Sequence, residues 1–217
     1  MSNATLDVRP PEHDDVQVDS DGWVRRFGLT ERFAHWWTVL MVATALLSGL
    51  GLGDDSESGS PMLTVHIAAV ALIGAGLLVA LVFGNTRALL HAIRRLFIFD
   101  RRDVAWARFY TRHPFRRGVH HEWGMFNPAQ KLLAWALSIS IAAVIITGIQ
   151  AWSAGGDDSG GPHGAMVVVA MTLVGFHIFM AVVNPTTRPA LAGMVLGRVR
   201  RSWAAKHHGG WLRDLDR

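Results

Sequence analysis

Residues 162–183 read PHGAMVVVAMTLVGFHIFMAVV, a largely apolar run that contains two histidines. It contains no Asp, Glu, Lys or Arg and is long enough to cross the hydrocarbon core of a bilayer as an α-helix. His163 and His177 lie 14 residues apart within it. At about 100° and 1.5 Å per residue, that interval returns to within about 40° of the same face, about 21 Å along the helix. The stretch therefore predicts a spanning helix that presents two imidazoles to one side at two depths.

Three more apolar stretches of similar length precede it, at about residues 30–53, 61–84 and 128–152. Ser60-Pro61 and Gly161-Pro162 are typical helix starts, because proline suits the first helical turn. The chain has 217 residues, of which 50% are hydrophobic and only 18% are charged, which argues against an ordinary cytosolic enzyme. We expect an all-α integral membrane protein with four transmembrane helices.

The basic residues indicate how these helices are oriented. All 21 Lys and Arg residues fall outside residues 33–86 and 132–187. The turns inside those two ranges carry only acidic charge, from Asp54, Asp55, Glu57, Asp157 and Asp158. Under the positive-inside rule both termini and the 85–127 connection are cytoplasmic, and the acidic turns are outside. This predicts a multi-pass protein of the bacterial plasma (inner) membrane whose arginines face lipid headgroups, with no nucleic acid as partner.

The chain divides into three parts on these grounds. Residues 1–22 are polar and acidic and are expected to form a flexible tail. Residues 23–190 form the four-helix membrane domain, and residues 191–217 form a cytoplasmic C-terminal segment. Apolar residues recur among arginines in the central connection and from Arg198 to Trp211, which predicts a short amphipathic helix in each at the inner membrane face.

Four histidines lie within the expected spans, and ionisable groups in lipid tend to be functional. His35 begins the first span near the inner face, and His66 begins the second near the outer face. Since the fourth span also begins outside, His163 is outer and His177 is inner. The pairs are therefore His66 with His163 and His35 with His177, which predicts two stacked b haems. Filling both axial positions with imidazole suits electron transfer rather than oxygen binding.

Other interpretations of these histidines stay open at this point. A single histidine inside a protein more often makes ordinary hydrogen bonds than binds a ligand. One alternative is therefore a membrane anchor whose four histidines are structural. A proton or metal transporter would favour carboxylates beside histidine, and the spans hold none beyond Glu31 at the inner edge. The absence of cysteine excludes covalently attached haem and cysteine-held iron–sulfur clusters. A stand-alone ferric or superoxide-linked reductase of cytochrome b type remains possible.

A short internal echo joins the first and third spans. Ser48-Gly49-Leu50 resembles Thr147-Gly148-Ile149, and aligning them sets Ala134 opposite His35. The echo is too short to establish a duplication. Glycines in the spans, among them Gly49, either let a porphyrin approach the backbone or allow close helix packing.

Several of these residues also carry a family resemblance, over residues 25–190. The matching segments are Arg32-Phe33-Ala34-His35-Trp36, Ser48-Gly49-Leu50, Phe126-Asn127-Pro128-Ala129-Gln130-Lys131, Thr147-Gly148 and the helix from His163 to His177. They resemble the cytochrome b (gamma) subunit of respiratory formate dehydrogenase. The wider group includes the cytochrome b subunits of nickel–iron hydrogenases and thiosulfate reductases.

The resemblance implies a di-haem subunit that takes electrons from an iron–sulfur subunit on the outer face, beside a catalytic subunit. It implies that menaquinone or ubiquinone is reduced near the inner haem. By motif, Asn127 and Gln130 would lie near the quinone beside the His177 haem; the alternative is that Asn127 only caps a helix. Ala129 stands where the family often has glycine, which bears on the pocket's shape. Arg32 would meet a haem propionate, or serve only as a positive-inside arginine.

Overall fold

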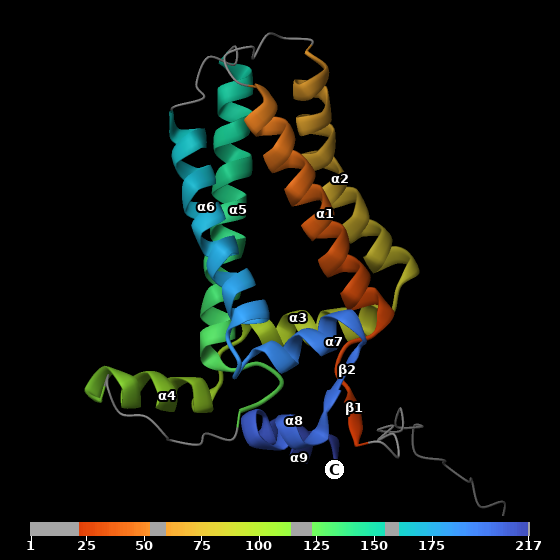
Figure 1. Ribbon diagram of the computed structural model, residues 1–217, viewed down its shortest axis with the longest axis vertical. Coiled ribbons are helices and arrows are strands. Elements are labelled where there is room, and N and C mark those ends of the chain that lie inside the picture. Colours follow the sequence, from red (N-terminus) through yellow and green to blue (C-terminus); the bar gives the residue numbers. More distant parts are fainter. Residues whose placement is uncertain (1–21, 53–59, 114–122, 155–160, 217) are drawn as a thin grey trace, which may run out of the picture.

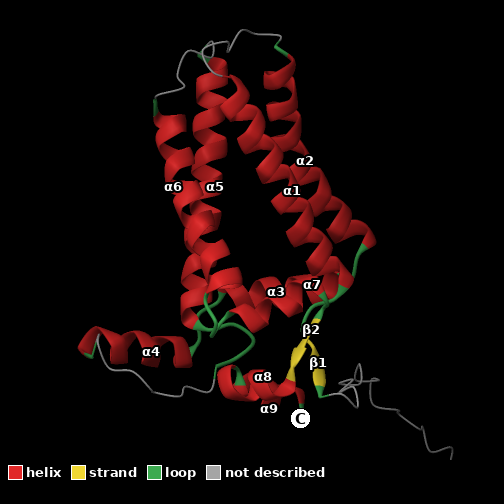
Figure 2. Cartoon of the chain, in the orientation of Figure 1, coloured by secondary structure: helices red, strands yellow, loops and turns green. Residues whose placement is uncertain are grey.

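The computed structural model describes residues 22–52, 60–113, 123–154 and 161–216. Most of these residues form helices, and two three-residue strands pair near the chain ends (Figure 2). The long helices are α1 (Leu29–Leu52), α2 (Pro61–Phe83), α5 (Pro128–Ser153) and α6 (Pro162–Ile178). The shorter elements are β1 (Trp23–Arg25), α3 (Thr86–Phe97), α4 (Arg101–Arg112), a 3-10 turn (Arg188–Ala190), α7 (Leu191–Val195), β2 (Arg198–Arg200), α8 (Arg201–His207) and α9 (Gly209–Leu215).

Four helices are long and apolar enough to cross a membrane, as the sequence predicts: α1, α2, α5, and α6 with the π-helical turn Phe179–Val183 that continues it. They form two hairpins, α1–α2 and α5–α6, which stand side by side (Figure 1). Few of their residues are buried within the protein, and large apolar side chains such as Leu50 and Ile139 are exposed along them. Such surfaces need lipid around them.

Local sequence explains where two of these helices begin. The Ser60 hydroxyl accepts a hydrogen bond from Leu63 N at 3.1 Å, and Pro61 follows in the first turn of α2. Asn127 caps α5 in the same way, with Pro128 in the first turn. Proline costs nothing at this position, because the amide it lacks would have no partner inside the helix.

The expected amphipathic segment in the central connection is α3. This helix lies across one end of both hairpins and contacts α1, α2 and α5 (Figure 1). Leu89 and Ala92 are buried, while the arginines of its last turn lie on the solvent side. Trp135 Nε1 donates to Phe97 O at 3.0 Å, which joins the end of α3 to α5.

The two ends of the chain meet below α3. β1 pairs antiparallel with β2, with Val24 opposite Val199, and α8 and α9 pack beside this ribbon. We call residues 22–28 and 197–216 the terminal cap, and this end of the bundle the cap end. The core of the terminal cap is made by Val24, Phe27, Met125, Val199, Ala204, Trp211 and Leu212.

The terminal cap differs from the single amphipathic helix expected over residues 198–211. The chain instead forms a strand and two short helices that meet at His208. Val199 and Trp211 are buried in a protein core rather than placed against lipid. The expected N-terminal tail, apart from Gly22, and the acidic turns Asp54, Asp55, Glu57, Asp157 and Asp158 lie outside the described residues.

Candidate functional site

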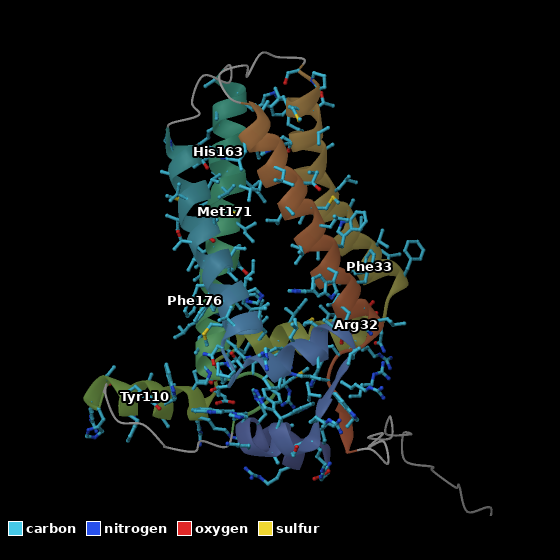
Figure 3. The ribbon with its side chains drawn as sticks, in the orientation of Figure 1. Arg32, Phe33, Tyr110, His163, Met171 and Phe176 are labelled. Carbon is cyan, nitrogen blue, oxygen red and sulfur yellow. The ribbon has the colours of Figure 1, made fainter. Side chains whose placement is uncertain are left out.

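The four histidines come together as two pairs. The ring centres of His35 on α1 and His177 on α6 are 6.2 Å apart, and those of His66 on α2 and His163 on α6 are 6.3 Å apart. The first pair lies toward the cap end, and the second toward the far end, where Figure 3 labels His163. Each pair joins one hairpin to the other, so the histidines line the inside of the bundle.

These separations fit an iron held between two imidazoles. A metal–imidazole bond of about 2.0 Å on each side places the two ring centres about 6 Å apart. Among the described residues no group of three or more His, Cys, Asp or Glu side chains is arranged to hold a metal ion. Two nitrogen donors alone suit an iron whose other four positions are filled by a porphyrin, and so the donor set fits b haem.

Backbone carbonyls fix the rings of the far pair. His66 Nδ1 lies 2.7 Å from Ala45 O on α1, and His163 Nδ1 lies 3.1 Å from Val144 O on α5. A carbonyl only accepts, so in both rings Nδ1 carries the hydrogen and donates it. The unprotonated Nε2 is then the metal-binding nitrogen, oriented by a partner behind it.

The His66 ring lies close to Gly49, and the His163 ring lies close to Gly148. A Cβ added at Gly49 would lie 3.2 Å from His66 Cε1, and one added at Gly148 would lie 3.0 Å from His163 Cε1. Hydroxyls sit one residue earlier, with Ser48 Oγ 3.5 Å from His66 Nδ1 and Thr147 Oγ1 3.4 Å from His163 Nδ1. At these positions the glycine makes room for the histidine ring.

The echo between the first and third spans therefore has a structural counterpart. Ala45, Ser48 and Gly49 surround His66 as Val144, Thr147 and Gly148 surround His163. The pair near the cap end has no such symmetry. His35 corresponds to Ala134 in the aligned helix, and aligning His66 with His163 sets Ala80 against His177.

Three other span glycines differ in their surroundings. A Cβ at Gly76 would overlap the Trp37 ring, whose Nε1 donates to Leu72 O at 2.7 Å. Gly76 thus serves close packing of α1 on α2. Gly74 and Gly175 have no side-chain neighbour within 4 Å of an added Cβ among the described residues.

Arg32 is engaged by backbone carbonyls at the cap end. Its Nε donates to Met194 O at 3.2 Å, and its Nη2 donates to Val195 O. Trp36 Nε1 donates to the same Met194 oxygen at 3.0 Å, so both side chains hold the end of α7. Arg32 also borders a cavity of about 270 Å³ that no histidine lines. The structure thus gives Arg32 a bracing role between α1 and α7.

Asn127 and Gln130 form a capping box at the start of α5. Gln130 N donates to Asn127 Oδ1 at 2.9 Å, and Asn127 N donates to Gln130 Oε1 at 3.0 Å. Capping, one of the two roles considered for Asn127, is therefore present. Both acceptor oxygens are used, while no hydrogen bond from either amide NH₂ group to a described residue is seen. Each side chain keeps two donors.

The sequence did not single out a buried ion pair beside this box. Lys131 Nζ lies 2.5 Å from Asp103 Oδ2, and both side chains are almost completely buried. Lys131 also donates to Ile98 O at 3.0 Å, which ties α5 to the junction of α3 and α4. In the sequence, this ion pair is signalled only by the position of Lys131 directly after Gln130.

Comparisons with known proteins find membrane cytochromes. The family described as Prokaryotic cytochrome b561 matches residues 26–197. The cytochrome b556(Fdn) subunit of the nitrate-inducible formate dehydrogenase of Escherichia coli (strain K12) is 24% identical over 215 residues, covering 86% of this chain and 89% of that protein. The formate dehydrogenase cytochrome b556 subunit of Haemophilus influenzae is 24% identical over 213 residues, covering 92% of this chain and 86% of that protein. The resemblance seen in the sequence is confirmed.

Proposed function

The chain belongs to the prokaryotic cytochrome b561 family, and we propose that it is the di-haem membrane subunit through which an oxidoreductase exchanges electrons with quinone. It is a multi-pass protein of the bacterial inner membrane, and its cofactor is haem b. The observation that carries the proposal is the presence of two histidine pairs at two depths, each with ring centres just over 6 Å apart. Membership of a cytochrome family argues against a histidine-dependent transporter.

We assign His66 and His163 to an outer haem and His35 and His177 to an inner haem. Bound haem b supplies one-electron transfer at its iron. Held by imidazoles from both sides, each haem would transfer electrons rather than bind oxygen. The Nδ1 groups of His66 and His163 donate to the carbonyls of Ala45 and Val144, and these bonds would orient Nε2 of each ring toward the iron.

The electron donor is proposed from the relatives. Two of them are described as cytochrome b556 subunits of formate dehydrogenase. By analogy, an iron–sulfur subunit and a catalytic subunit would dock on the outer face, at the acidic turns. A hydrogenase or another respiratory reductase is the alternative donor of the same kind, since the membrane subunit has the same task in each.

We further propose that both termini face the cytoplasm. The support is the segregation of all 21 Lys and Arg residues away from residues 33–86 and 132–187. Residues 1–22 would then be a tail, residues 23–190 the membrane domain, and residues 191–217 a cytoplasmic segment. The pairing of β1 with β2 means that the membrane domain and the C-terminal segment share one small core.

Reporter fusions test this orientation. An alkaline phosphatase domain, which is active only outside the cytoplasm, should be active when inserted at Ser56 and inactive when fused after Arg217. A fluorescent protein that folds only in the cytoplasm should give the opposite pattern and serves as the control. If the phosphatase is active after Arg217, every inner and outer assignment above is reversed.

Quinone is proposed to bind at the cap end, beside the inner haem. Asn127 and Gln130 start α5 there. Their amide NH₂ groups bond to no residue that the structure describes, and such donors suit the carbonyl oxygens of menaquinone or ubiquinone. Ala134 follows Gln130 by one helical turn, where the aligned helix α1 carries His35. The smaller side chain gives room for a flat ring on that face of α5.

The capping box allows a clean test of these donors. Asn127→Asp and Gln130→Glu keep the oxygen that caps the helix but remove the amide donors. Losing one hydrogen bond of about 1 kcal/mol should lower quinone turnover about fivefold in each variant, with both haem spectra intact. The measurement is the oxidation of the chemically reduced protein by menadione and decylubiquinone.

Asn85→Asp is the matched control, because Asn85 caps α3 through the same kind of contact, with Ala88 N donating to Oδ1 at 3.0 Å. This variant should leave quinone turnover unchanged. Unchanged turnover in both α5 variants would mean that Asn127 and Gln130 only cap the helix and that the quinone site lies elsewhere.

A further inference from the structure

The loop that leads into α5 is held at three successive carbonyls by the two ends of the chain. Trp211 N donates to Trp123 O at 3.0 Å, and His208 Nδ1 donates to Gly124 O at 2.9 Å. Arg26 Nη2 donates to Met125 O at 2.7 Å. Three hydrogen bonds from residues remote in sequence thus fix a segment that ends two residues before Asn127.

The two side chains that make these bonds are buried. Arg26 is 6% exposed and His208 is 2% exposed. The Arg26 guanidinium lies within 6 Å of four ring centres, those of Phe27, Phe126, Trp203 and Trp211. Such an aromatic box attracts a cation and prevents the guanidinium from swinging away.

Burial also fixes the charge of each group. Desolvation lowers the pKa of Arg26 to about 10, so it stays charged at neutral pH. Desolvation, together with the nearby Arg26 and His207 charges, lowers the pKa of His208 to about 3, although the bond to Gly124 O acts in the opposite direction. His208 is therefore neutral across the physiological range, and its Nδ1–H donates to Gly124 throughout.

An apolar core alone does not require this arrangement. Arg26 Nε and Nη1 are buried without a hydrogen-bond partner among the described residues, and a buried donor left unpaired costs stability. A methionine would fill the same space without that cost. Unlike methionine, Arg26 donates a hydrogen bond to Met125 O. Because Met125 lies two residues before Asn127, a small displacement of the Met125 backbone would also move Asn127.

We propose that Arg26 and His208 are positioning residues of the quinone site, which hold the loop at residues 123–125 so that the Asn127 and Gln130 amides face the quinone. This inference rests on the proposed function, because it assigns those two amides to quinone. It adds that the site depends on both ends of the chain. Neither side chain touches the quinone or a haem in this proposal.

The test measures how quinone affinity and loop order change together. The full-length protein with its haems is reduced chemically, and its oxidation by decylubiquinone and menadione is followed to obtain KM and the maximum rate. His208→Leu removes the donor to Gly124, and Arg26→Met removes the donor to Met125. Each should raise the KM for quinone about fivefold, leaving the maximum rate, haem content and haem spectra unchanged.

A second readout does not depend on turnover. Hydrogen exchange at the Gln130 amide, which Asn127 caps, should quicken in both variants, because the loop carrying the cap is released. His208→Asn offers an amide donor near the same position and should restore both KM and exchange. Arg201→Gln is the control, since it breaks an exposed ion pair with Asp216 in the same cap and should change neither value.

The outcomes separate this inference from the proposed function. If Asn127→Asp raises KM while His208→Leu and Arg26→Met do not, the quinone site stands and the positioning role is overturned. If the two variants lower the thermal midpoint without altering KM, their role is only to stabilise the cap, and the inference fails. If Asn127→Asp and Gln130→Glu also leave KM unchanged, the quinone site lies elsewhere and the positioning role is overturned with it, while the assignment of the two haems is tested separately by their ligands.

Discussion

His66→Ala and His163→Ala are each expected to remove the same single haem, so that the haem content per protein falls by half. His35→Ala and His177→Ala should each remove the other haem. The reason is geometric, because the ring centres pair at 6.3 and 6.2 Å across the two hairpins and each iron needs both of its imidazoles. The measurement is extracted haem per protein with reduced-minus-oxidised spectra of the purified chain.

Combined variants make this result sharper. His66→Ala with His163→Ala should lose no more haem than either alone, whereas His66→Ala with His177→Ala should lose both. His91→Ala is the control, since His91 is exposed on α3 and accepts from Arg95 Nε at 3.0 Å. Loss of both haems from every single variant would contradict two independent centres, and unchanged haem in all four would refute haem ligation.

Gly148→Ala should perturb the outer haem site more mildly than the histidine substitutions do. Its new methyl would lie 3.0 Å from His163 Cε1, which is closer than ordinary van der Waals contact. The His163 ring must then shift, and its bond to Val144 O weakens. We expect retained haem with an altered outer midpoint potential, and no change in the inner one.

The features set by local sequence could be predicted, because their causes lie within a few residues. Spans of apolar residues had to become helices in a membrane, and Pro61, Pro128 and Pro162 marked where three of them start. The 14-residue interval between His163 and His177 set two depths on one helix. Charge segregation then left a single way to pair the four histidines as haem ligands. In the structure the ring centres of His35 and His177 lie 6.2 Å apart, and those of His66 and His163 lie 6.3 Å apart.

The contacts between remote segments could not be predicted in the same way. Strands β1 and β2 have three residues each, too few for an alternating pattern to be recognised. Trp211 follows arginine-rich sequence that suits a membrane surface equally well. Its burial depends on a core to which remote residues such as Val24, Phe27 and Met125 contribute. The carbonyls that orient His66 and His163 belong to the backbone and leave no mark in sequence. Their neighbours Ser48-Gly49 and Thr147-Gly148 did leave one, as a short echo.

The buried ion pair leads to the second large effect, which is on stability. Lys131→Met is expected to destabilise the cap end by about 3–5 kcal/mol, because it leaves the Asp103 carboxylate buried without its cation. Both partners are nearly sealed from solvent, with side chains only 6% and 4% exposed, and their contact is 2.5 Å. Asp103 Oδ2 also accepts from Asp100 N at 2.7 Å, so the loss weakens the capping box that starts α4.

Thermal unfolding of the detergent-solubilised protein, followed by tryptophan fluorescence, measures this loss. Pairing Lys131→Met with Asp103→Asn should recover most of it, because the asparagine is neutral and keeps an oxygen for the cap. Arg95→Gln is the control: its ion pair with Asp214 is exposed on both sides, and such pairs contribute little. If the double variant is no more stable than Lys131→Met alone, the unpaired charge is not the cause. The bond from Lys131 to Ile98 O would then account for the stability of this end of the bundle.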